Sequence, residues 1–240
     1  MAVLTGLDPF AGVHPLSRST AVLSAQALDL PQPDQLCGPF AAQVALHGVG
    51  LPGVPSLGDL ARAAGTRVWP HDEPAARPPG EASRVDGWDG LPRAGSLDES
   101  GTDAASLAAG VERATAGEVA VVGVTGPWTS ASVASLLTAV RDAPFPTGVV
   151  ANLRTGPISG GLWHVGHFVV LWGLDPVAGQ VAVADSYTSL GLAGRYLADL
   201  DDVAAALPDR GVLLLVRTTE ADAASTLVMS GGLETGLWGT

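Results

Sequence analysis

The sequence predicts an α+β fold with one antiparallel sheet. Segments with apolar residues at helical spacing dominate the first half of the chain, and strand-like apolar runs dominate the second half. Two of these runs are joined by "DPVAGQ", which is typical of an antiparallel hairpin over residues 167–187. The chain has 240 residues and no internal repeat, so a single domain spanning 1–240 is expected.

Three helices are predicted near the start of the chain. "RSTAVLSAQAL" (18–28) has a serine or a threonine available as its cap, and the two prolines of "PQP" end it. "CGPFAAQVALHGV" (37–49) carries apolar residues at helical spacing, so a buried helix is expected to begin at or just after its cysteine. "SLGDLARAAGT" (56–66) has a serine cap at its start and a glycine stop at its end.

Three stretches lack a clear period. Residues 70–101 are rich in proline, glycine and charged residues, which predicts a long loop or an insertion. Residues 1–30 are expected to form an N-terminal extension, and residues 218–240 a C-terminal tail whose structure the pattern does not indicate. The regular elements are therefore expected between these stretches.

Helices and strands alternate after residue 101. "GTDAASLAAGVERAT" (101–115) predicts a helix and "EVAVVGVTG" (118–126) a strand. "TSASVASLLTAVRDA" (129–143) predicts another helix, and "TGVVANLRTG" (147–156) a buried strand. Beyond the hairpin, two further elements are expected, the helix 197–207 and the strand 211–218.

The composition argues against several classes of partner. Twelve basic residues stand against 24 acidic ones, and the net charge of -12 disfavours binding to nucleic acid or to an anionic membrane surface. The apolar runs are strand length, far short of the ~20 residues that a membrane helix needs, so no membrane insertion is expected. The start of the chain has no signal-peptide pattern, and a single cysteine cannot form an internal disulfide. These observations predict a cytoplasmic protein.

The single cysteine, Cys37, is the candidate nucleophile. At a helix start, the helix dipole and the free backbone N–H groups favour the thiolate and lower the pKa of the thiol. Gly38 would let a substrate backbone approach closely, and Pro39 needs no N–H in the first helical turn. The alternative is that Cys37 is an inert, buried small hydrophobe, as free cysteines often are.

The catalytic base is expected at His167. This residue opens the first strand of the hairpin over 167–187, and Asp185 ends the second strand. Antiparallel pairing brings these two ends side by side, so the carboxylate can orient the imidazole and stabilise its cation. His164 is a rival base, but three residues before His167 in a continuous strand it would face the other way. Asp175 lies at the far end of the hairpin, where a turn residue satisfies its own backbone.

The remaining candidates have simpler explanations. His47 lies inside a predicted helix, where a hydrogen-bonded core histidine is expected, and His14 and His71 lie in predicted loops exposed to solvent. Trp163 could form the wall of a substrate cleft or simply pack. The chain has no second cysteine and no HExxH spacing, and "GGLWHVGH" does not follow the strand-to-helix pattern of a phosphate loop. No metal and no cofactor is expected.

Three pieces of the chain resemble papain-like cysteine peptidases in their order and setting: "QPDQLCGPF", "GHFVVLWGLDPVAGQVAVADSY" and "GVLLLVR". The resemblance is strongest to the bacteriocin-processing branch, which removes double-glycine leaders, and to its stand-alone relatives. It covers most of residues 31–217. It implies a papain-like fold, with N-terminal helices packed on a C-terminal antiparallel sheet.

The resemblance also implies roles for individual residues. Cys37 corresponds to the nucleophile, His167 to the general base and acid, and Asp185 to the residue that orients the histidine. A glutamine before the cysteine would donate its side-chain amide to the oxyanion, beside the Cys37 backbone N–H. The family usually has this glutamine six residues before the cysteine, whereas this chain has Gln32 and Gln35. We favour Gln32, because Gln35 is too close to Cys37 to fold back over the site.

The expected function is that of a cysteine peptidase, or thiol hydrolase, that cleaves a peptide or amide bond through a Cys–His–Asp triad. Peptide maturation is one setting for such an activity. Two alternatives remain open: a papain-like acyltransferase that uses the same cysteine, and a non-catalytic, peptide-binding relative of these peptidases. The expected partner is a peptide or protein substrate, and no oligomeric state is predicted.

Overall fold

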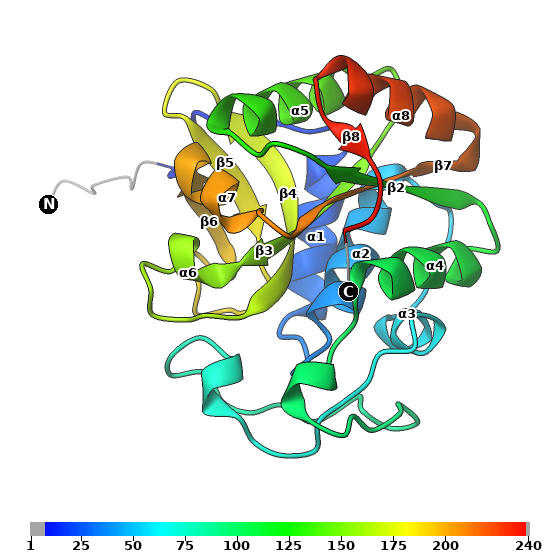
Figure 1. Ribbon diagram of the computed structural model, residues 1–240, viewed down its shortest axis with the longest axis vertical. Coiled ribbons are helices and arrows are strands. Elements are labelled where there is room, and N and C mark those ends of the chain that lie inside the picture. Colours follow the sequence, from blue (N-terminus) through cyan, green and yellow to red (C-terminus); the bar gives the residue numbers. More distant parts are fainter. Residues whose placement is uncertain (1–7, 239–240) are drawn as a thin grey trace, which may run out of the picture.

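The computed structural model describes residues 8–238, and they form three layers (Figure 1). The central layer is an antiparallel sheet in the order β6-β5-β4-β3-β7-β2-β8, with β1 paired to β4. Its strands are β1 (His14–Pro15), β2 (Val119–Thr125), β3 (Gly148–Arg154), β4 (Gly166–Asp175), β5 (Gln180–Ala184), β6 (Arg195–Asp199), β7 (Gly211–Arg217) and β8 (Glu234–Thr235). The predicted α+β class with an antiparallel sheet is thus confirmed.

Helices cover both faces of the sheet. One layer contains α1 (Ser19–Asp29), α2 (Cys37–Val49), α3 (Leu57–Ala63) and α4 (Ala104–Ala114). The other contains α5 (Ser130–Asp142), α7 (Leu200–Ala206) and α8 (Ala221–Ser230), and the short α6 (Thr155–Ile158) follows β3. The expected N-terminal helices therefore account for one helical layer. The second helical layer packs on the opposite face of the sheet through its own apolar core.

The buried helix α2 lies against the centre of the sheet. Its residues are small and apolar, and ten of its thirteen residues are buried. Glycines allow the close approach: a β-carbon at Gly148 on β3 would clash with the carbonyl oxygen of Ala45 on α2. Because helix and sheet are this close, the position of Cys37 relative to the central strands is tightly defined.

The helix predicted over residues 197–207 begins later than expected. Residues Arg195–Asp199 instead form β6, which pairs with β5, and α7 starts at Leu200. The apolar pattern of this segment is compatible with either element. The free edge of β5 offers a ladder of backbone hydrogen bonds, and this long-range pairing outweighs the local helix propensity.

Both ends of the described chain belong to the fold. In the stretch expected to be an N-terminal extension, β1 pairs with β4 and α1 packs on α2. The first residue outside α1 is Arg18, which has a left-handed backbone (φ 58°) and makes no side-chain cap hydrogen bond, so the predicted serine or threonine cap is wrong. In the stretch expected to be a tail, α8 covers the sheet and β8 pairs with β2.

Residues 70–101 contain only two short 3₁₀ turns, Pro74–Ala76 and Leu97–Glu99, and they lie below the helices and the sheet in Figure 1. A small apolar cluster that includes Trp88 and Leu91 holds them against the rest of the chain. Among residues 8–238, no helix has the length and apolarity needed to cross a bilayer.

Candidate active site

Cys37 is the first residue of α2, as the sequence predicted. Its side chain is partly exposed, and it lines a cavity of about 830 Å³. Gly38 leaves room for the Phe168 ring, because a β-carbon there would lie 3.3 Å from the ring. The thiol therefore lies at the positive end of the helix dipole, with access to a space large enough for a peptide.

His167 and Asp185 meet at one end of the hairpin. His167 lies on β4 and Asp185 directly follows the paired strand β5, and His167 Nε2 lies 2.9 Å from Asp185 Oδ1. Both side chains are buried, with exposures of 3% and 0%. The structure thus brings together the two residues that antiparallel pairing predicted would meet.

Asp185 is held in place by four further donors. Its Oδ1 accepts hydrogen bonds from the backbone N–H groups of Ser186 (2.6 Å) and Tyr187 (3.2 Å) and lies 3.4 Å from the Ser186 hydroxyl, while its Oδ2 accepts one from the Tyr196 hydroxyl (3.1 Å). Asp185 is therefore positioned to hold the His167 ring in one orientation and to stabilise its positive charge.

The Cys37 thiol and the His167 ring lie close enough to interact, and each favours the charged form of the other. Burial would raise the pKa of Cys37, but the His167 hydrogen bond and charge, with the Phe168 backbone N–H, lower it below its usual value. Burial would lower the pKa of His167, but the charge and hydrogen bond of Asp185 and the contact with Cys37 raise it. The pair therefore favours a thiolate and an imidazolium.

Aromatic rings enclose the imidazole. The Trp163 ring centroid lies 4.9 Å and the Tyr187 centroid 5.6 Å from that of His167. Trp163 is 5% exposed, so its role at this position is to pack over the imidazole. Because Nε2 of His167 faces Asp185, Nδ1 is the nitrogen left for Cys37.

The two candidate glutamines have different surroundings. Gln35 has a left-handed backbone (φ 65°), and its amide makes two hydrogen bonds to the Trp69 backbone, at 3.0 and 2.6 Å. Gln32 is 1% exposed, lines the cavity with Cys37 and lies within hydrogen-bonding reach of the Tyr187 hydroxyl. Of the two, Gln32 is the one whose amide is not already bound to the backbone of a neighbouring loop.

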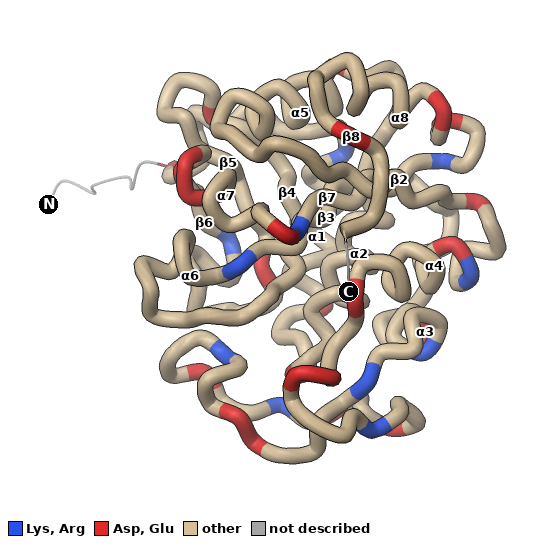
Figure 2. Tube along the Cα trace, in the orientation of Figure 1, with Lys and Arg blue, Asp and Glu red and all other residues tan. Residues whose placement is uncertain are grey.

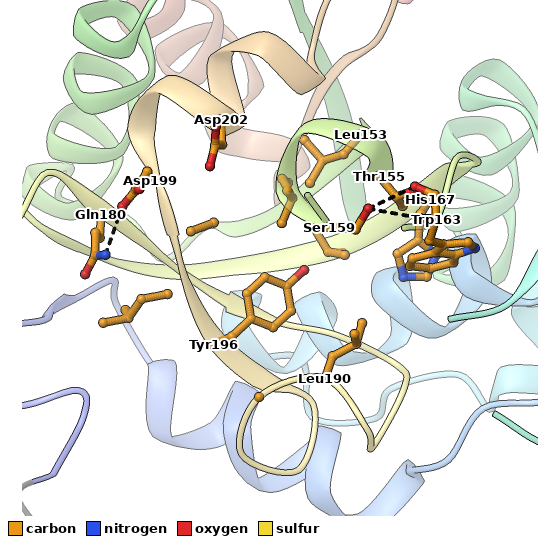
Figure 3. A pocket seen from close by; sticks show the side chains of 15 residues that line it. Leu153, Thr155, Ser159, Trp163, His167, Gln180, Leu190, Tyr196, Asp199 and Asp202 are labelled. Carbon is orange, nitrogen blue, oxygen red and sulfur yellow. Dashed lines mark hydrogen bonds between the residues drawn. The ribbon is translucent and has the colours of Figure 1, made fainter. Parts of the chain in front are cut away.

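A second, smaller pocket of about 310 Å³ lies on the other side of His167, towards α6 and α7. Figure 3 shows Tyr196 in the middle of this pocket, with Trp163 and His167 at one end. His167 lines both spaces. The imidazole and its ring of partners therefore form the wall between the two.

The other histidines lie away from the Cys37 thiol. His164 is exposed in the loop before β4 and His71 is exposed on the 70–101 segment, and both line the outer part of the cavity. His14 is in β1, not in a loop, and is 3.3 Å from Arg141. His47 is only partly buried, so its prediction as a core histidine is wrong, because its side of α2 meets solvent beside α1.

Asp175 occupies the hairpin turn as predicted. Its Oδ1 accepts hydrogen bonds from the backbone N–H groups of Val177 and Ala178, at 3.0 and 2.9 Å. In the part of the chain that the structure describes, no group of three or more histidine, cysteine, aspartate or glutamate residues has an arrangement suited to a metal ion.

Several residues around the site were missed by the sequence analysis. Tyr187 and Tyr196 both contact the His167–Asp185 pair, and Asn152 and Arg210 line the cavity near Cys37. Of these residues, only Asn152 could have been noticed in the sequence, because it is a polar residue within the apolar run of a predicted buried strand. In the structure its side chain is 3% exposed.

The amino-acid sequence matches the model of one known protein family. The model of the family described as "Family of unknown function (DUF6885)" matches residues 16–161 and 156–239, which together cover most of the chain. The protein therefore belongs to this family. No curated protein matches the sequence. The first matched range contains Cys37, and the second contains His167 and Asp185.

Proposed function

We propose that this protein is a papain-like cysteine peptidase that cleaves a peptide or amide bond with Cys37. The observation that carries the proposal is the contact of a partly exposed cysteine, at the start of a buried helix, with a buried histidine that an aspartate orients. This arrangement is the one that nucleophilic catalysis by a thiol requires. A free thiol functions only when reduced, which supports a cytoplasmic setting.

In the proposed reaction, the Cys37 thiolate attacks the substrate carbonyl carbon and forms a carbon–sulfur bond. The carbonyl oxygen becomes an oxyanion, which the Cys37 backbone N–H and the Gln32 amide would stabilise. His167 then transfers its Nδ1 proton to the leaving amine as the carbon–nitrogen bond breaks. Water, deprotonated by His167, attacks the thioester and releases the acid. Asp185 stabilises the imidazolium throughout.

The proposal is tested by incubating the protein with a complex peptide mixture and identifying new termini by mass spectrometry. We expect cleavage by the native chain and none by Cys37→Ala, whose melting temperature should match that of the native protein. Products that carry an added amine or thiol in place of water would show acyl transfer. Identical product sets from both proteins would refute catalysis by Cys37 and favour a peptide-binding role.

The glutamine assignment makes its own prediction. Gln32→Ala is expected to lower kcat/KM by about 10²-fold, because one oxyanion donor is lost. Gln35→Ala is expected to lower that free energy by about 1–3 kcal/mol, because two partners on the Trp69 backbone lose their hydrogen bonds. Turnover assays and urea unfolding check both variants, and the reverse pattern would assign the oxyanion donor to Gln35.

A further inference from the structure

Arg210 immediately precedes β7, which is separated by β3 from β4, the strand that carries His167. Its guanidinium group covers Gly166, the residue before His167, and a β-carbon at position 166 would lie 2.7 Å from both Nη1 and Nη2. A larger residue at position 166 would displace the guanidinium from this place. Arg210 and Gly166 line the same cavity as Cys37, so the cation lies within the proposed active-site cleft.

Arg210 has no direct ion pair with a carboxylate among the described residues, and the negative groups that act on it, Cys37 and Asp209, act at longer range. Its Nη1 lies 3.4 Å from Oδ1 of the buried Asn152, and among residues 8–238 no carboxylate oxygen lies within 4.0 Å of its guanidinium. Arg154 is close by and is also positive, and among the described residues its one carboxylate contact is with the exposed Asp209, at 3.7 Å. Burial, and then repulsion by Arg154, lower the pKa of Arg210 from its usual value.

Among the described residues, three arginines line the Cys37 cavity, Arg77, Arg154 and Arg210, and Arg210 is the one with no carboxylate within 4.0 Å. The net charge is -12, and Figure 2 shows acidic positions throughout the molecule and far fewer basic ones. A half-buried guanidinium with free N–H donors is the group that proteins use to bind carboxylates in bidentate geometry. The buried Asn152 beside it accepts a hydrogen bond from Nη1, and both residues line the cavity.

We propose that Arg210, with Arg154 and Asn152, forms a subsite for a carboxylate of the substrate next to the Cys37 thiol. This inference rests on the proposed function in one respect, that the substrate is a peptide. The carboxylate would be either the C-terminal carboxylate of a short peptide or the side chain of an aspartate or glutamate near the cleaved bond. The protein would accordingly select anionic substrates despite its own negative charge.

A pair of alkylating reagents tests the subsite without any peptide. Iodoacetate and iodoacetamide both lose iodide when the Cys37 thiolate forms a carbon–sulfur bond, and they differ in carrying a carboxylate or a neutral amide. The alkylation rate with iodoacetate is divided by the rate with iodoacetamide, and the result is divided by the same ratio for free cysteine. Because both reagents react with the same thiolate, the degree of ionisation of the thiol does not affect this normalised ratio. At low salt this normalised ratio is expected to be about tenfold above one in the native protein.

Arg210→Gln is expected to bring the normalised ratio close to one, and Arg210→Lys to retain part of the preference. Arg62→Gln is the matched control, because Arg62 is an exposed arginine on α3 outside the cavity, and it should leave the ratio unchanged. A native ratio of one or below would overturn the proposal. A normalised ratio that stays high in Arg210→Gln would also overturn it. If the substitution slowed alkylation by both reagents equally, the ratio would be unchanged, and Arg210 would only stabilise the thiolate.

Peptide pairs identify the source of the carboxylate. Free-acid and amidated versions of one cleaved peptide test the C-terminal group, and glutamate-to-glutamine versions test the side chain. We expect one of these neutralisations to raise KM about tenfold for the native protein and to have no effect on Arg210→Gln. Equal KM values across both pairs would contradict the subsite. An absence of any turnover would instead refute the peptidase proposal, and the alkylation ratio would still decide the subsite.

Discussion

His167→Ala is expected to slow peptide turnover by about 10⁴-fold or more, because the variant loses both the general acid–base group and the partner that ionises Cys37. It should also change the pH dependence of Cys37 alkylation by iodoacetamide. The lowered pKa of Cys37 means that the native thiol is already ionised below the range of an ordinary thiol, about pH 8.5. The native rate should therefore stay high below pH 8.5 and fall only as pH drops through the lowered pKa.

In the variant the imidazolium is absent while burial of the thiol remains, so the alkylation rate should rise only towards pH 8.5 or above. Intact-protein mass after brief treatment measures both curves. His164→Ala is the matched control, since His164 is exposed at the outer part of the same cavity. It should retain the native profile. A native curve that rises only near pH 8.5, or equal curves for the native protein and His167→Ala, would show that Cys37 and His167 form no ion pair.

Arg77→Leu is expected to lower the free energy of unfolding by about 3–5 kcal/mol, the range for one partner removed from a buried ion pair. Arg77 Nη1 lies 3.0 Å from Asp34 Oδ2, and both side chains are 7% exposed. The same oxygen of Asp34 accepts hydrogen bonds from Ser83 and from the Arg84 backbone. Without Arg77, a buried carboxylate would lose its positive partner, and the 70–101 segment would lose one of its links to the residues before α2.

Urea unfolding at neutral pH measures this effect. Arg62→Leu removes an exposed arginine whose 2.8 Å pair with Asp59 is solvated, and it should cost at most about 1 kcal/mol. Replacing Asp34 and Arg77 together by asparagine and leucine should recover much of the loss, because no unpaired charge is left. If Arg77→Leu were no worse than Arg62→Leu, the pair would contribute nothing beyond a surface contact.

Local patterns were sufficient to predict the centre of the candidate site. A cysteine followed by glycine and proline, ahead of a run of small apolar residues, indicated the helix that begins at Cys37. The hairpin followed from two apolar runs and a turn, and antiparallel pairing then placed His167 beside Asp185. These predictions succeeded because each depends on the period of one element or on its immediate neighbour in sequence.

The rest depends on contacts between distant parts of the chain. Strand β6 was missed because it exists through pairing with the edge of β5. The choice between Gln32 and Gln35 depends on a left-handed residue that turns Gln35 towards Trp69. Arg210 and Asn152 meet because β7 and β3 are neighbours in the sheet, although 58 positions separate the two residues. No sequence period carries such information.

The strand order also determines when the thiol becomes reactive during synthesis on the ribosome. Strands β2 and β3 do not pair with each other; β7, made about 60 residues later, is inserted between them. Until β7 has emerged, α2 has no complete sheet to pack against and His167 has no fixed place beside Cys37. Until then the nascent chain would carry an ordinary thiol.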